Sequence, residues 1–89
     1  MEFEWAEAKR LAVLNALGLD FIRGQLLFDG RPLHTTPSPR DGEPRWVSVG
    51  ILNERLIALV WTKRDHMIRI ITMRRARRVE ERRYRALYG

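Results

Sequence analysis

The chain has 89 residues and a mass of 10.6 kDa, the length of one small domain, which excludes an enzyme with a cleft between two lobes. Hydrophobic residues make up 45% of the sequence and charged residues 31%, which favours a folded globular protein over a disordered one. The lack of cysteine excludes disulfides, thiol nucleophiles and cysteine-based zinc sites, and no apolar run approaches the roughly 18 residues of a membrane span. We therefore expect a single domain over residues 1–89, located in the cytoplasm and without membrane contact.

The amino-terminal third predicts one short strand and two helices. Phe3–Trp5 alternates aromatic and acidic residues, as a half-buried strand does. Ala6–Leu17 is rich in helix formers and is followed by Gly18, a residue that commonly ends helices. Asp20 is placed to cap a second helix that runs to about Phe28.

The remainder of the chain predicts strands followed by a helix. Leu33–Thr35 precedes a proline-rich loop and suits an irregular or edge strand. Three longer strands, Arg45–Leu52, Arg55–Thr62 and Met67–Met73, are joined by tight turns and predict an antiparallel meander. From Ala76–Tyr88 the period is helical again. The expected fold class is α+β: a small antiparallel sheet with two amino-terminal helices and one carboxy-terminal helix on one face.

The positive charge is concentrated near the carboxy terminus. The net charge is +6, yet residues 1–62 carry seven basic and eight acidic side chains, whereas residues 63–85 carry ten basic and three acidic ones. Nine of those ten are arginines, whose planar guanidinium groups bind phosphates through paired hydrogen bonds. Such a stretch favours a nucleic-acid-binding protein, with an acidic protein partner or a simple solvated surface as alternatives.

Arg69 is a charged residue within the apolar strand Met67–Met73. Strict alternation places it on the same face as Met73 and, beyond the strand, Arg75, with Thr72 on the opposite face. Because burying an unpaired charge is costly, Arg69 must pair with a carboxylate or face a cleft that binds an anion. The carboxylates considered for that pairing are Glu2, Glu4 and Glu43.

Arginines at the strand ends predict a phosphate-binding clamp. Arg74 and Arg75 leave the end of the strand that holds Arg69, and Arg45 opens an earlier strand after the proline-flanked loop. The four guanidinium groups are expected at one end of the sheet. The chain has no glycine-rich phosphate loop, metalloprotease motif or nucleophile elbow.

Several short motifs follow one another along nearly the whole chain. They are Phe3–Trp5, Lys9, Gly18–Phe21, Phe28–Asp29, Asp41–Arg45, Gly50, Thr62–Arg64, Arg69–Ala76, Glu80, Arg82 and Tyr84. Their order and spacing resemble the BrnT family of toxins from bacterial type II toxin–antitoxin systems. The resemblance implies a RelE-like fold and an endoribonuclease that cleaves mRNA without a metal ion or other cofactor. It also implies neutralisation by a BrnA-like antitoxin, through which alone the complex would contact operator DNA.

Under this resemblance the arginines would bind and stabilise the reacting phosphate. In metal-free cleavage the 2′-hydroxyl attacks the adjacent phosphorus, so preorganised cations stabilise the charge of the transition state. We expect the catalytic residues to be Arg45, Arg69, Thr72, Arg74 and Tyr84. Further RNA contacts are expected from Arg64, Arg75, Arg77 and Arg78.

The helix before Asp20 departs from the family pattern. The family's Asn-x-x-Lys-His is replaced there by Val13, Ala16 and Leu17. A missing general acid or base lowers a rate about 10²–10⁴-fold, unless His34, His66 or Tyr84 substitutes. The alternative function is therefore a weak or inactive relative that binds its antitoxin in operon repression, or a small nucleic-acid-binding protein.

Overall fold

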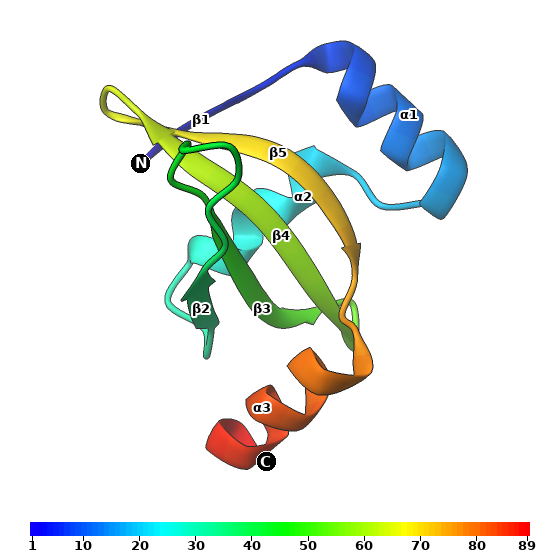
Figure 1. Ribbon diagram of the computed structural model, residues 1–89. Coiled ribbons are helices and arrows are strands. Elements are labelled where there is room, and N and C mark those ends of the chain that lie inside the picture. The colour runs from blue at the N-terminus through cyan, green and yellow to red at the C-terminus, as the bar shows by residue number, and fades with distance from the viewer.

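The computed structural model describes residues 1–89 and contains five strands in one sheet (Figure 1). The elements are β1 (Glu2–Trp5), α1 (Glu7–Leu17), α2 (Phe21–Gly24), the 3₁₀ helix η1 (Gln25–Phe28), β2 (His34–Pro37), β3 (Trp46–Leu52), β4 (Arg55–Arg64), β5 (Met67–Arg75) and α3 (Arg78–Tyr88). The strand order across the sheet is β1-β5-β4-β3-β2. The predicted α+β class is confirmed, and the predicted segments are present with ends shifted by a few residues, except that the predicted second helix is divided into α2 and the 3₁₀ helix η1.

The sheet is mixed, so the prediction of a wholly antiparallel sheet is wrong. Strands β3, β4 and β5 form the predicted meander, and β2 pairs antiparallel with β3. The first strand, β1, runs parallel to β5, and Glu4 stands opposite Arg69. Parallel neighbours need a long crossover connection, and here α1, α2, η1 and the other three strands lie between β1 and β5 in the chain.

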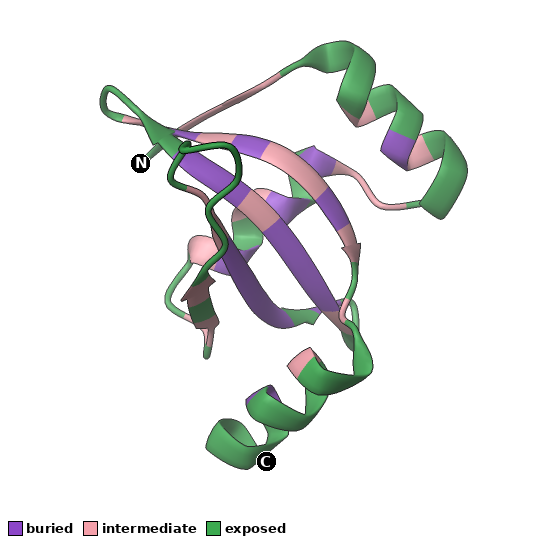
Figure 2. Cartoon of the chain, in the orientation of Figure 1, coloured by how far each residue is buried: buried purple, intermediate pink, exposed green.

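Helices cover both faces of the sheet, and the prediction of helices on one face is also wrong. One face carries α1, α2 and η1 over a core that includes Ile57 and Leu59. The other face carries α3, whose Tyr84 packs in a cluster with Val49 and Ala58. Strand β4 is central and apolar on both sides, so each face needs a cover. Figure 2 shows that α3 is exposed along most of its length, and it covers only one end of its face.

Strand β5 contains a β-bulge at Ile71. Val60 of β4 pairs with Thr72, but the next residue of β4, Trp61, pairs with Ile70. Strand β5 therefore has one residue more than its partner at this point. Such an insertion reverses the alternation of faces along the rest of the strand.

The bulge regroups the side chains of β5. Met73 is fully buried in the core beneath α1 and α2, instead of sharing the face of Arg69 as predicted. Thr72 and Arg74 lie on the face of Arg69, because they pair with residues of β4 from that face. The predicted alternation is therefore wrong beyond the bulge, and Arg75 is on the opposite face from Arg69.

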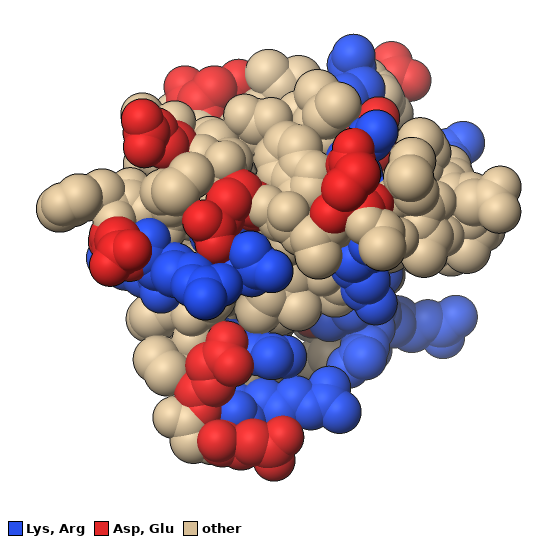
Figure 3. Space-filling model, turned by 90° about the horizontal axis from the view of Figure 1, so that it is seen from above, with Lys and Arg blue, Asp and Glu red and all other residues tan.

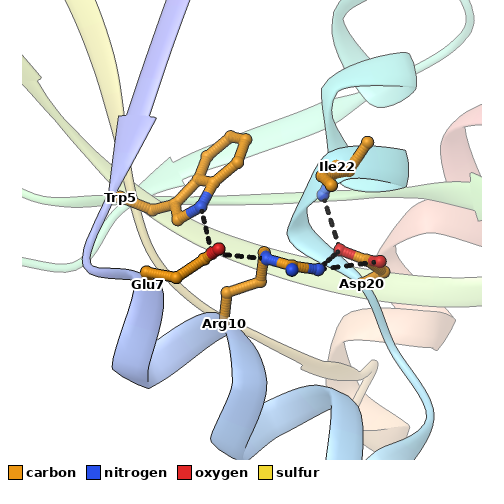
Figure 4. Close-up of polar contacts among 5 residues, drawn as sticks. All are labelled: Trp5, Glu7, Arg10, Asp20 and Ile22. Carbon is orange, nitrogen blue, oxygen red and sulfur yellow. Dashed lines mark hydrogen bonds and ion pairs between the residues drawn. The ribbon is translucent and has the colours of Figure 1, made fainter.

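A polar network joins β1, α1 and α2 (Figure 4). Arg10 forms an ion pair with Glu7 and donates two hydrogen bonds of 3.0 and 3.1 Å to Asp20, which also accepts from the backbone N–H of Ile22. The indole of Trp5 donates to Glu7 at 3.2 Å. Bonds from Arg10 and Trp5 lower the pKa of Glu7, and the bond from Ile22 lowers that of Asp20.

No single helix is long and apolar enough to span a membrane; only α1 together with the α2–η1 segment has the length and composition, and this pair is bent by 96°.

Candidate nucleic-acid interface

The part of the sheet face that α3 leaves uncovered holds two adjoining hollows. The first has a volume of about 630 Å³, within the range of roughly 300–1,000 Å³ for ligand sites, and is lined by residues from α1, β4, β5 and the segment 43–45. The second extends to Arg77 at the start of α3, and the two share Lys9, Arg45 and Ile71. We call the two hollows together the basic groove. Its charged lining residues are Lys9, Arg40, Glu43, Arg45, Lys63, Arg64, Arg69, Arg74 and Arg77.

The basic groove concentrates charge of one sign. All but one of its charged lining residues are cations, and the exception is Glu43. Figure 3, which views the molecule from above, shows Lys and Arg side chains gathered in bands with a few carboxylates beside them. A hollow lined with one sign of charge raises the local concentration of oppositely charged ligands, here anions. No group of three or more His, Asp or Glu side chains is placed to hold a metal ion.

A tight hairpin holds Glu43 at the groove. The tip residues Asp41 and Gly42 have φ angles of 52° and 79°, a conformation that the Asp-Gly sequence favours. Arg40 and Glu43 flank the tip and exchange backbone hydrogen bonds of 3.1 and 2.9 Å. The backbone of Glu43 is therefore fixed, while its side chain stays 48% exposed.

Arg45 lies at the junction of the two hollows. The Thr62 hydroxyl donates a 2.6 Å hydrogen bond to the Pro44 carbonyl, which ties this segment to β4. The Nε atom of Arg45 is buried and has no hydrogen-bond partner, and the nearest carboxylate oxygen, from Glu43, is 3.5 Å away. Arg45 therefore has an ion-pair partner but donates no hydrogen bond within the protein, and an anion bound at the junction can accept hydrogen bonds from its guanidinium group.

Arg69 has both of the surroundings predicted as alternatives, a carboxylate and a groove. Its Nη1 donates a 2.9 Å hydrogen bond to Glu4, which is therefore the pairing carboxylate among the three considered. Arg64 lies 3.7 Å from the same carboxylate. The side chains of Arg69 and Glu4 are 31% and 27% exposed, so solvent screens the pair and it adds little to stability. The other N–H groups of Arg69 make no hydrogen bond within the protein and can bind an anion in the groove.

Arg74 joins the groove wall to α3. Its two terminal nitrogens donate to the two carboxylate oxygens of Glu80 at 2.7 and 2.9 Å. Glu80, in the first turn of α3, also accepts a 2.7 Å bond from the backbone N–H of Arg77, the residue that precedes the helix. The bonds from Arg74, more than the bond from Arg77, lower the pKa of Glu80. The fork of Arg74 is thus already engaged and cannot grip a phosphate bidentately unless Glu80 releases it.

The structure brings together six of the nine predicted site residues. Those that line the groove are Arg45, Arg64, Arg69, Thr72, Arg74 and Arg77. Arg75 is on the other face of the sheet, and Arg78 lies on the outer side of α3. Tyr84, on the side of α3 that packs against the sheet, is 3% exposed, and its hydroxyl lies 3.5 Å from the Pro32 carbonyl.

Four charged residues of the groove were not among the predicted site residues. They are Lys9, Arg40, Glu43 and Lys63. Lys9, Glu43 and Lys63 do belong to the motif order noted in the sequence, so a signal for them existed, although Glu43 also has the local pattern of a solvated turn; Arg40 lies outside that order. Neither histidine of the chain lines the groove, and neither do Ala16 and Leu17.

Comparison with known families gives one match that covers most of the chain. Residues 5–80 match the family described as the ribonuclease toxin, BrnT, of a type II toxin–antitoxin system. A search of curated protein sequences finds no match. The matched segment includes every element that lines the groove.

Proposed function

Because the chain belongs to the BrnT family of ribonuclease toxins of type II toxin–antitoxin systems, we propose that its basic groove binds messenger RNA and cleaves it without a metal ion. The observation that carries this proposal is the lining of the groove by eight cations and one carboxylate. Arg45 and Arg69 reach the groove from strand regions far apart in the sequence, and each has N–H groups without a hydrogen-bond partner. Such donors suit a phosphate held between them.

Arg45 and Arg69 stabilise the transition state. Attack of the 2′-hydroxyl on phosphorus adds negative charge to the phosphate oxygens, and donors already in place at that charge contribute about 3–4 kcal/mol each. Glu4 holds Arg69 from the β1 side, which preorganises the guanidinium. Thr72 lines the second hollow and offers a hydroxyl to the next phosphate. Arg74 contributes charge and holds α3, and Tyr84 stays in the core without contact to RNA.

The partner we propose is a BrnA-like antitoxin that covers the basic groove. A toxin of a type II system is paired with an antitoxin, and the exposed cations suit a segment that is acidic or amphipathic. In this proposal the toxin contacts operator DNA only through the antitoxin.

A second candidate function is an antitoxin-binding module without nuclease activity. It is favoured by the absence of histidine from the groove and by the engagement of Arg74 with Glu80. Induced expression of wild type and Arg69→Ala in a bacterial host, with cleavage mapping of the transcripts, separates the two functions. Growth arrest with discrete mRNA cuts in wild type alone supports the nuclease, whereas normal growth with antitoxin binding intact supports the module. Purified wild type should also cut RNA in the presence of EDTA.

A further inference from the structure

Metal-free RNA cleavage needs a group that takes the proton of the 2′-hydroxyl, and the groove contains one residue suited to it. Lysine and arginine are protonated at neutral pH and can only donate hydrogen bonds. Both histidines lie outside the groove, and Glu43 is its sole carboxylate. We propose that Glu43 is the proton acceptor that activates the 2′-hydroxyl. This inference rests on the proposed nuclease function and extends it to a residue that was not among the expected catalytic or RNA-contact residues.

The position of Glu43 supports this role better than that of the other carboxylates near the groove. Its Oε1 lies 3.5 Å from the unpartnered Nε of Arg45, so an acceptor and a phosphate-binding donor stand side by side at the first hollow. Glu4 and Glu80 each accept arginine hydrogen bonds of 2.9 Å or less, and neither lines the groove. The carboxylate of Glu43 accepts no hydrogen bond from a side chain and remains half exposed.

The chemical step balances without an oxidant, a reductant or a metal ion. Glu43 takes the proton as the 2′ oxygen forms its bond to phosphorus, and the bond from phosphorus to the 5′ oxygen breaks. The departing 5′ oxygen takes a proton from water in the open groove, and Glu43 then returns its proton to solvent. The products are a 2′,3′-cyclic phosphate on one fragment and a 5′-hydroxyl on the other.

Three variants test the assignment. Glu43→Gln keeps the shape but cannot accept the proton, and Glu43→Ala leaves space for a small carboxylate from solution. Asp41→Asn is the matched control: it removes the same charge from the same hairpin, outside the groove, at a left-handed position that Asn tolerates. Single-turnover cleavage of an RNA oligonucleotide is measured at saturating protein, and affinity is measured with the all-2′-deoxy oligonucleotide, which cannot be cut by this route.

Glu43→Gln should cleave about 10²–10⁴-fold more slowly than wild type. It should bind the deoxy oligonucleotide at least as tightly as wild type does, because the substitution removes a negative charge from the basic groove. Asp41→Asn should cleave at close to the wild-type rate, and sodium formate should restore activity to Glu43→Ala but not to Arg69→Ala. The assignment is overturned if wild type cuts and Glu43→Gln cuts within about tenfold of it, or if formate restores nothing. If wild type leaves RNA intact, the proposed function itself fails, and the role of Glu43 with it.

Discussion

Raising the KCl concentration from about 50 to about 200 mM should weaken the binding of single-stranded nucleic acid to the basic groove about 100-fold. The magnitude follows from the pairing of the groove's cations. Of the eight, Arg45, Arg69 and Arg74 already have a carboxylate of their own chain within 3.5 Å, so they release few counterions on binding RNA. The five that remain are Lys9, Arg40, Lys63, Arg64 and Arg77. Each phosphate neutralised on a single strand adds about −0.7 to the log–log salt slope, which gives about −3.5 in total.

Fluorescence anisotropy of a labelled all-2′-deoxy oligonucleotide, titrated at several salt concentrations, measures this slope directly. Lys63→Ala removes one unpaired cation from the groove and should make the slope shallower by about 0.7. Arg55→Ala is the matched control, since Arg55 is exposed at the start of β4 and does not line the groove. A slope shallower than about −1 for wild type, or the same change from both variants, would refute the idea that the groove is the binding surface.

Three further predictions concern catalysis, the start of α3 and the partner. Arg69→Lys should lose RNA cleavage nearly as fully as Arg69→Ala, because lysine lacks the planar fork of the guanidinium group. Both variants should stay folded by circular dichroism, and unfolding of Arg69→Ala would instead assign the residue a purely structural role. Glu80→Gln should lower the free energy of urea unfolding by about 1–2 kcal/mol at neutral pH. Because folding lowers the pKa of Glu80, its ionised carboxylate stabilises the folded state at pH values above the unfolded-state pKa. This stabilisation is lost as the pH falls through the folded-state pKa, so an equal loss of stability from Glu80→Gln in acid would contradict this account. A BrnA-like antitoxin at about 100 times its Kd should add about 2.7 kcal/mol and raise the Tm by roughly 10–20 °C, and an unchanged Tm would count against the proposed partner.

Local sequence patterns were sufficient to predict the helices and strands but not all of their pairings. Gly18 ends α1 with a φ of 71°, and the Asp20 side chain caps α2, as expected from the properties of these residues. Such signals act over a few neighbouring residues. The parallel pairing of β1 with β5 brings Glu4 to Arg69 across 65 residues, and no local pattern encodes a contact at that separation.

The bulge at Ile71 decided how much of the candidate site could be predicted. Ile70 and Met73 are both buried in one core, yet they are three residues apart, and strict alternation would place them on opposite faces. Burial of both side chains therefore requires an extra residue between them. The same insertion places Thr72 with Arg69, which the alternation pattern had separated. The spacing of Ile70 and Met73 therefore indicates the bulge only when it is already known that both side chains are buried on the same face of the sheet.

The parallel pairing of the first strand with the last also fixes when the groove can form during synthesis. Strand β1 has no other partner in the sheet, so it must wait for β5, and contacts between segments so far apart in the chain form slowly. A nascent chain that ends at residue 62 carries seven basic and eight acidic side chains and lacks Arg64, Arg69 and Arg74. Such a chain neither attracts RNA by its net charge nor holds the groove that would bind it. The basic groove thus forms only after β5 has been synthesised.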